Sequence, residues 1–283
     1  MTMRAAFQGE PGAYSEAAVF EFFSQTDVSA VPCESFEKVF QAVKNGDCQF
    51  GVLPIENSLA GSIHQNYDLL MQNPLWVVGE HYLRVSHCLI ARPGSTLADI
   101  KTVMSHPQAL AQCAQYLKSL PGVKVEPVYD TAGSVKIIRS QNDPTLAAIA
   151  SVQAARIFGM QVLAEHIEDN QANFTRFLVV ANEAVHPVEN AKTSIVFTLK
   201  NEPGSLYQAM REFATRGIDL CKIESRPLVG TPWDYLFYLD LMGSTENESV
   251  KQALQNLQGF APMLRILGSY PSKKPAANLN QIS

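Results

Sequence analysis

The chain has 283 residues, 46% of them hydrophobic and 17% charged, which is the composition of a folded protein large enough for two domains. The net charge is −5, and lysine and arginine form no cluster apart from a PSKK stretch near the C-terminus, so we do not expect nucleic-acid binding. No apolar run has the length of a signal peptide or a membrane span, so we expect a cytoplasmic protein without membrane contact. The five cysteines contain no C-x-x-C pair, so we expect neither disulfides nor a zinc site.

Strand-like and helix-like segments alternate from the N-terminus to about residue 181. The expected strands are MRAAFQG at 3–9, FGVLPI at 50–55, KTVMS at 101–105 and LAAIA at 146–150. The first expected helix begins at Ser15. Further helices are expected at 35–47, 58–72, 106–120, 131–140 and 151–159. Alternation of this kind predicts an α/β fold of parallel sheets with crossover helices.

The pattern changes after a predicted domain boundary at 182–192. Strands are expected at 193–200, 218–229, 234–243 and 263–270, and helices at 203–217 and 247–260, with a turn containing Gly230 and Pro232. The order β-α-β-β-α-β is that of the ferredoxin-like unit. We therefore expect a first domain at 1–181, a second at 192–272 and a disordered tail at 273–283.

Five polar clusters stand where strands meet helices or where a strand begins. They are GAYSE at 12–16, PIENS at 54–58, SHPQA at 105–109, DTAGS at 130–134 and NFTRF at 173–177. Helix capping or a turn explains any one of them, but the carboxyl ends of strands are also where α/β folds bind ligands. The sequence has no G-x-G-x-x-G, phosphate-loop, H-E-x-x-H or G-x-S-x-G motif. We therefore expect neither a cofactor nor a metal.

The clusters extend to the segments GAYSEAA, PIENSLAGSIHQNYDLL, SHPQALAQC, DTAGSVKII and NFTRFLVV, and a later segment reads KIESRP. Together these segments resemble prephenate dehydratase with a C-terminal ACT regulatory domain. The resemblance covers about residues 3–272, with the motifs in the family's order. It implies two α/β lobes with a cleft between them, similar to periplasmic binding proteins. Lobe one would be about 1–80 plus 166–181, and lobe two about 81–165.

The resemblance implies conversion of prephenate to phenylpyruvate, with loss of water and carbon dioxide, in L-phenylalanine biosynthesis. It also implies feedback inhibition by L-phenylalanine and a homodimer or homotetramer formed through the ACT domains. Two alternatives stay open. One is arogenate dehydratase, whose substrate carries an amino group in place of the keto oxygen. The other is a non-catalytic amino-acid sensor.

The family's essential threonine matches Thr175, whose hydroxyl would donate a hydrogen bond to the departing oxygen. Arg176 would clamp a substrate carboxylate, or would instead be a structural arginine. Because neighbouring strand residues point to opposite faces, both can reach a cleft only if the strand starts irregularly, with regular pairing from near Phe177. Glu56 would relay a proton or orient the substrate.

The predicted substrate-binding residues come from the same clusters. They are Ser15, Asn57, Ser58, Thr131, Ala132, Asn173 and Phe177. Asn57 or Ser58 is expected to cap a helix whose free N–H groups bind one carboxylate, while Thr131 and the N–H groups after it bind the second. Asp130 stands where serine is common in the family, and no direct role is expected of it.

The phenylalanine site is expected where two ACT domains meet. Its predicted residues are Pro203, Gly204, Ser205, Leu206, Asp219, Leu220, Glu224 and Ser225. A helix start at 204–206 suits the effector's carboxylate, and a strand start at Asp219 suits its ammonium group. The family often has G-A-L-V where this sequence has Gly204-Ser205-Leu206-Tyr207, so the sequence differs at Ser205 and Tyr207. It also has Asp219 at a position where asparagine is common in the family.

Overall fold

A computed structural model describes residues 2–228 and 235–273, which form three β-sheets flanked by helices. The turn predicted at Gly230 and Pro232 lies outside the described residues, as does the predicted tail from residue 274 onward. In the described ranges, none of the helices combines the length and apolar character needed to span a bilayer. All five cysteines are free thiols.

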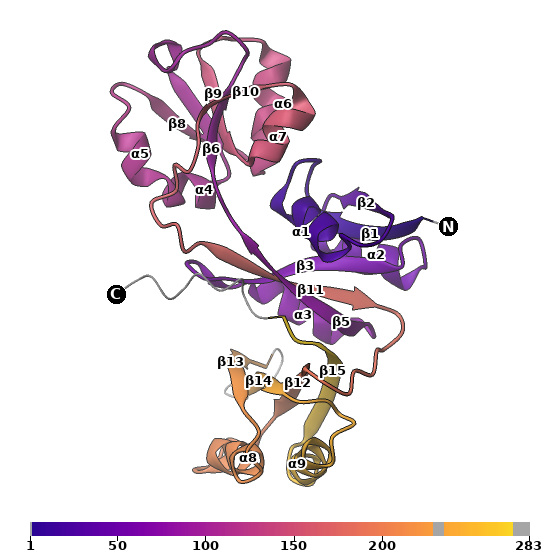
Figure 1. The fold of residues 1–283 in the computed structure, drawn as a ribbon. Helices are drawn as coiled ribbons and strands as arrows, with labels where there is room; N and C mark the ends of the chain where they lie inside the picture. The colour runs from indigo at the N-terminus through magenta and orange to yellow at the C-terminus, as the bar shows by residue number, and fades with distance from the viewer. Residues whose placement is uncertain (1, 229–234, 274–283) are drawn as a thin grey trace. The chain divides into compact units, whose positions relative to one another are not determined.

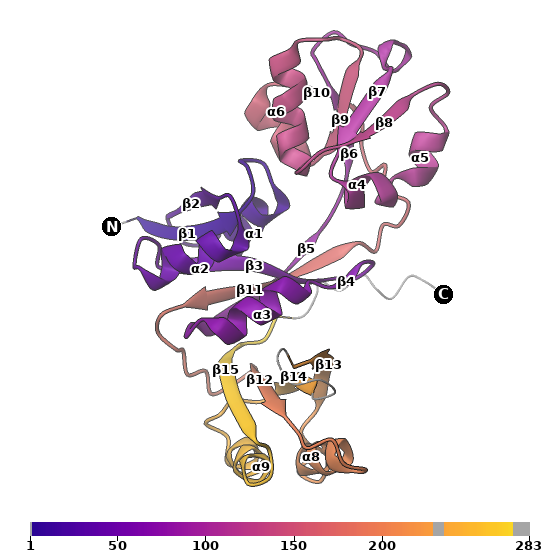
Figure 2. The same ribbon diagram turned by 180° about the vertical axis from the view of Figure 1, so that it is seen from behind.

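The first sheet has six strands in the order β2-β1-β3-β11-β5, with β4 paired to β3. Its strands are β1 (Met3–Gln8), β2 (Val28–Cys33), β3 (Phe50–Asn57), β4 (Gly61–Ser62), β5 (Trp76–Arg84) and β11 (Phe174–Ala181). Its helices are α1 (Tyr14–Phe22), α2 (Phe36–Lys44) and α3 (His64–Gln72). Helices α1 and α2 cover one face of this sheet and α3 covers the other (Figures 1 and 2).

The second sheet has the order β10-β6-β9-β7-β8. Its strands are β6 (Cys88–Ala91), β7 (Thr102–Ser105), β8 (Lys124–Pro127), β9 (Leu146–Ala150) and β10 (Gln161–Ala164). Its helices are η1 (Leu97–Asp99), α4 (Pro107–Gln112), α5 (Ala114–Lys118), α6 (Thr131–Gln141) and α7 (Val152–Phe158). Figures 1 and 2 show α4 and α5 on one side of the sheet and α6 and α7 on the other.

The expectation of parallel sheets is wrong for this second sheet. Strand β6 lies between β9 and β10 and runs antiparallel to both. Strand β7, in contrast, runs parallel to both of its neighbours, β8 and β9. The sheet is therefore mixed.

Two expected helices also differ from the structure. The helix expected at 58–72 begins only at His64, because residues before it form a tight turn in which Gly61 has φ +81°, and the short strand β4 pairs back on β3. The helix expected at 106–120 divides at Cys113, which is fully buried and has non-helical φ and ψ of −116° and 22°.

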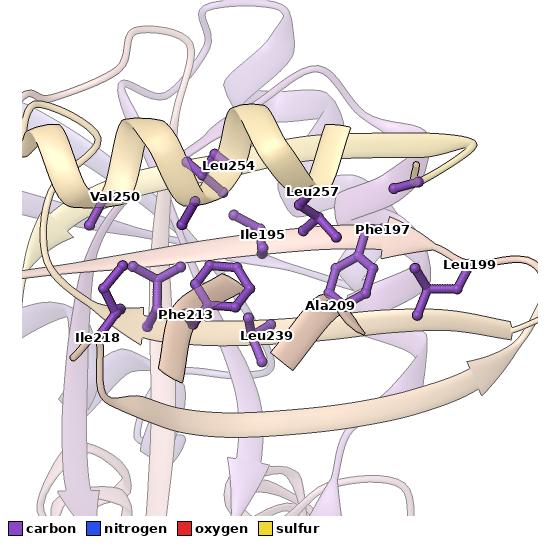
Figure 3. Close-up of a cluster of buried hydrophobic side chains, with 13 residues drawn as sticks. Ile195, Phe197, Leu199, Ala209, Phe213, Ile218, Leu239, Val250, Leu254 and Leu257 are labelled. Carbon is purple, nitrogen blue, oxygen red and sulfur yellow. The ribbon is translucent and has the colours of Figure 1, made fainter. Parts of the chain in front are cut away.

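The third sheet has the order β13-β14-β12-β15, the strand order of the ferredoxin-like unit predicted from the sequence. Its strands are β12 (Ala191–Thr198), β13 (Leu220–Pro227), β14 (Tyr235–Met242) and β15 (Met263–Pro271), and its helices are α8 (Ser205–Ala214) and α9 (Glu248–Gln258). Both helices lie on one face of the sheet (Figure 1). Figure 3 shows buried side chains such as Ile195, Phe213 and Leu254 filling the space between them and the strands.

The described chain divides into two compact units. The first contains 2–69 and 81–177, and the second contains 70–80, 178–228 and 235–273. Within the second unit, the buried Lys192 ammonium lies 2.7 Å from the buried Glu80 carboxylate. Arg265 of β15 donates to the carbonyl groups of Leu70 and Met71 at 3.0 and 2.9 Å, in the last turn of α3.

Candidate active site

A cavity of about 510 Å³ in the first compact unit brings together residues from both of its sheets. The ends of β3 and β11 contribute Asn57, Thr175 and Phe177. The rest of the wall comes largely from the starts of four helices, at 13–15 in α1, 35–36 in α2, 106–109 in α4 and 130–131 in α6. A cavity of this volume, at the carboxyl ends of strands, is typical of a small-molecule site.

Four helix N-termini lie around the cavity, and the unpaired N–H groups of a helix start favour an anion. Among the described residues that line it, none is lysine or arginine. Side chains already cap three of these helices: Ser35 in α2, His106 in α4 and Asp130 in α6. Ala13, which precedes α1, gives no side-chain cap. The first N–H groups of α1, beside the predicted Ser15, therefore suit a carboxylate of a ligand best.

Gly12 places the start of α1 at the cavity. A Cβ atom on this residue would lie 2.7 Å from the Cα atom of Ala154 in α7, and its φ of +90° favours glycine. The Ser151 hydroxyl donates to the Gly12 carbonyl at 2.7 Å, and the Gly12 N–H donates to the Glu16 carboxylate at 2.7 Å. These contacts hold the loop before α1 against α7.

Thr175 is buried to 8% exposure, and its hydroxyl is oriented by Asn57. The Asn57 side-chain oxygen accepts the backbone N–H groups of Leu59 and Ala60 at 3.0 and 2.9 Å, which fixes which end of the amide carries the nitrogen. That nitrogen donates to Thr175 Oγ1 at 3.1 Å. Because the hydroxyl oxygen accepts this bond, its proton remains for an acceptor in the cavity.

The same amide starts a longer chain of hydrogen bonds. Asn57 donates to Asn173 Oδ1 at 2.8 Å, and Asn173 donates to Gln112 Oε1 at 3.0 Å. Gln112 Oε1 also lies 2.9 Å from His87 Nε2, and an amide oxygen only accepts, so this imidazole nitrogen carries a hydrogen. Burial lowers the pKa of His87, which favours its neutral form. The Tyr14 hydroxyl, whose pKa burial raises, lies 2.9 Å from Nδ1.

Sequence reasoning missed Tyr14, His87 and Gln112, although all three line the cavity. Tyr14 and Gln112 stand inside the GAYSEAA and SHPQALAQC motifs, so the motifs themselves were the available signal. His87 had no such signal, because it follows β5 in a segment without a recognised cluster.

The structure brings only part of the predicted site together. Cavity-lining residues among those predicted are Ser15, Asn57, Thr131, Thr175 and Phe177. Those that do not line it are Glu56, Ser58, Ala132, Asn173 and Arg176.

Arg176 lies away from the cavity because β11 is a regular strand from Phe174 onward. The expected irregular start is therefore wrong: Thr175 and Phe177 face the cavity, and Arg176 points to the opposite face. Arg176 is 6% exposed, and its guanidinium carbon lies 6.0 Å from the centre of the Tyr82 ring. This position supports the structural alternative over the carboxylate clamp. Glu56 also does not line the cavity, although its neighbour Asn57 and Pro54, two residues before it in β3, do.

Ser58 holds the chain before β11 instead of capping a helix. Its hydroxyl donates to the Ala172 carbonyl at 2.8 Å and accepts the Phe174 N–H at 2.9 Å. Because α3 begins only at His64, the N–H groups expected to bind a carboxylate after Ser58 are not at a helix start. Asn173 is fully buried and acts on the cavity through Asn57 and Gln112.

The start of α6 is also occupied differently from the prediction. The Gly133 N–H donates to the Asp130 carboxylate at 2.7 Å, and Ala132 is fully buried. Burial raises the pKa of Asp130, while the hydrogen bond from Gly133 lowers it. A helix start expected to bind a substrate carboxylate thus already binds one of the protein's own.

The predicted phenylalanine-site residues form two separate groups in one chain. Gly204, with φ +87°, precedes α8, and Glu224 and Ser225 of β13 lie toward the same end, level with Val196 and Phe197 of β12. Asp219 follows α8 and leads into Leu220 at the start of β13, at the other end of a helix about 15 Å long. One small ligand therefore does not reach both Gly204 and Asp219 of the same chain.

Comparison with known proteins decides the family. The family described as prephenate dehydratase matches residues 5–185. The chain belongs to this family. Its architecture is the two-lobed, periplasmic-binding-protein-like fold expected from the sequence.

Plant proteins are among the relatives of this family member. It is 48% identical to arogenate dehydratase/prephenate dehydratase 2, chloroplastic, of Arabidopsis thaliana, over 95% of the chain and 73% of the relative. It is 47% identical to arogenate dehydratase 2 of Petunia hybrida, over 95% and 72%.

Two solved structures also resemble this family member over nearly their whole length. A prephenate dehydratase from Arthrobacter aurescens in complex with L-Phe has a TM-score of 0.89 at 32% identity, covering 97% of this chain and 92% of that one. A protein described as GqqA, a novel type of quorum quenching acylase, has a TM-score of 0.88 at 36% identity, covering 95% and 98%.

The expected cytoplasmic location is contradicted by these comparisons. Several of the Arabidopsis relatives are named as chloroplastic, which points to plastids. The expectation rested on the lack of an apolar N-terminal segment. Plastid transit peptides are amphipathic and rich in serine and arginine, so that criterion does not test for them.

Proposed function

We propose that the protein is a dehydratase that acts on arogenate in preference to prephenate. The Thr175 hydroxyl carries the proposal, because its oxygen accepts from Asn57 and its proton is free to bond within the cavity. The relatives at 48% and 47% identity carry arogenate dehydratase in their names, which supports arogenate ahead of the prephenate that the sequence motifs suggested.

In the proposed reaction, the ring carboxylate leaves as carbon dioxide, and the electron pair of the broken carbon–carbon bond enters the ring. The ring hydroxyl leaves with its own electron pair and, on gaining a proton, becomes water. Thr175 donates a hydrogen bond to this oxygen, which strengthens as negative charge builds on it in the transition state. The uncapped start of α1, beside Ser15, binds a substrate carboxylate through backbone N–H groups.

The test is a comparison of kcat/KM on the two substrates. Arogenate should give L-phenylalanine, detected by chromatography, and prephenate should give phenylpyruvate, detected by ultraviolet absorbance. We expect a higher kcat/KM for arogenate. If the protein forms neither product, the result would support an amino-acid sensor. If the protein instead hydrolyses an acylated quorum signal, the result would support the acylase activity named for one structural relative.

We further propose that 1–181 is the catalytic region and that 192–272 is an ACT domain that binds L-phenylalanine. The βαββαβ order of the second region and the L-Phe complex of a relative with a TM-score of 0.89 support this. The effector would bind between the start of α8 in one copy and the start of β13 in another. The assembly would be a homodimer or homotetramer, and its size is measurable by light scattering with and without L-phenylalanine.

A further inference from the structure

Asp130 is an acid on the cavity wall whose carboxylate interacts with the backbone N–H groups of Gly133 and Ala132 at the start of α6. Its Oδ1 atom accepts the Gly133 N–H at 2.7 Å, as the N-cap of α6. Its Oδ2 atom is turned toward Gly9, where an added Cβ atom would lie 3.6 Å from it. The residue is half-buried, so this oxygen is partly removed from water.

The charges around Asp130 leave it without a cationic partner among the cavity-lining residues. The nearby Lys136 ammonium lies 3.0 Å from the Glu10 carboxylate. Burial and the Glu10 carboxylate raise the pKa of Asp130, while the hydrogen bond from Gly133 and the nearby His106 lower it. A ligand cation would offset this cost of holding a carboxylate in the cavity.

The two proposed substrates differ at one position, where arogenate has an ammonium group and prephenate a keto oxygen. An ammonium group donates hydrogen bonds and attracts a carboxylate, whereas a keto oxygen only accepts and is repelled by it. The uncapped start of α1 favours a carboxylate, which both substrates have, so it does not distinguish the two.

We propose that Asp130 is the specificity-determining residue that binds the amino group of the substrate and selects arogenate over prephenate. This inference rests on the proposed function. It also assigns a role to Asp130, for which the sequence analysis expected no direct role.

The test is the substitution Asp130→Asn in the full-length protein. Asparagine is as good an N-cap as aspartate, so α6 should keep its start and the melting temperature should stay close to that of the wild type. The kcat/KM for arogenate should fall by about 10–100-fold, the loss expected for a charge-assisted hydrogen bond, while that for prephenate should hold or rise. The matched control is Glu34→Gln, which removes the same charge from an exposed acid of the cavity rim and should leave the ratio unchanged.

The outcomes separate this inference from the proposed function. Turnover of both substrates with an unchanged ratio in Asp130→Asn would overturn the assignment and leave the dehydratase activity standing. An equal change of the ratio in Glu34→Gln would show a general effect of charge and would also overturn it. If the wild type converts neither substrate, the proposed function fails and this inference fails with it.

Discussion

Thr175 and its neighbour Arg176 stand next to each other in the chain but serve different surroundings. The hydroxyl faces a polar cavity and is oriented by Asn57, while the guanidinium lies beside Tyr82 on the other face of β11. The alternation of a regular strand is enough to cause this separation. Each residue therefore has its own test.

Replacement of Thr175 by alanine should lower kcat by ~10²–10⁴, because it removes the positioned donor to the leaving oxygen. Thr175→Ser should keep part of the activity, since the hydroxyl and its bond from Asn57 remain possible. Steady-state kinetics on arogenate, together with circular dichroism of the variants, measures both effects. An alanine variant with nearly wild-type turnover would show that Thr175 is not catalytic.

Replacement of Arg176 by lysine should lower the melting temperature and leave kcat/KM within a few-fold of the wild type. A lysine ammonium lacks the planar group that stacks on an aromatic ring, and its surroundings beside Tyr82 are buried. Thermal unfolding and kinetics on one preparation give both quantities, with the exposed Arg139→Lys as control. A stable variant with strongly impaired kinetics would restore the carboxylate clamp.

The sequence identifies many of the cavity residues but not the directions in which they point. Asn57 and Thr175, which the motifs singled out, line the cavity. The same motifs also contain Glu56 and Arg176, which do not line it. Only the pairing of β3 and β11 in a regular sheet decides which of two neighbours faces inward, and that pairing joins residues more than a hundred positions apart.

At the scale of elements, helices with a clear cap and an apolar face were predictable. Ser35 caps α2 and Gly159 ends α7, as expected from their positions beside periodic apolar residues. The start of α3 was not predictable, because residues 58–63 contain no helix breaker except Gly61 and their turn is fixed by the side chain of Asn57. These local hydrogen bonds from a side chain to the backbone compete with the helix there.

The end of α3 depends on a residue nearly two hundred positions away. Arg265 donates to the carbonyl groups of Leu70, Met71 and Asn73 at 2.7–3.0 Å, which satisfies acceptors that a helix end leaves without partners. Arg265→Met should lower the free energy of unfolding by about 1–3 kcal/mol, because these carbonyl groups lose a charged donor. Chemical denaturation measures the change, and Arg139→Met, at an exposed position, is the control. Equal stability of the two variants would contradict this role.

At the scale of the whole molecule, the two groups of effector residues lie at opposite ends of α8, so regulation should depend on association. L-phenylalanine should reduce substrate affinity with a coupling of ~1–3 kcal/mol, or about 5–150-fold, and a substrate analogue should weaken L-phenylalanine binding by the same factor. Calorimetric titrations with and without the analogue measure this. Equal affinities in the two titrations would make the second domain structural.

A variant of the effector site provides the control for those titrations. Gly204 has φ +87°, a conformation that alanine adopts only with strain. Gly204→Ala should therefore weaken L-phenylalanine binding while kcat and KM without the effector stay unchanged. Loss of basal activity in this variant would indicate a general folding defect.

The helix starts that surround the cavity have a consequence for how such a site evolves. A backbone N–H group is present whichever side chain a mutation introduces, proline excepted, whereas a binding site built on lysine or arginine is lost with one codon change. If the start of α1 binds a carboxylate as proposed, mutations in the wall, at Asp130 among others, can exchange the group recognised beside it while the affinity for the carboxylate persists. A lineage with such a site can change its substrate gradually, without passing through an ancestor that binds nothing.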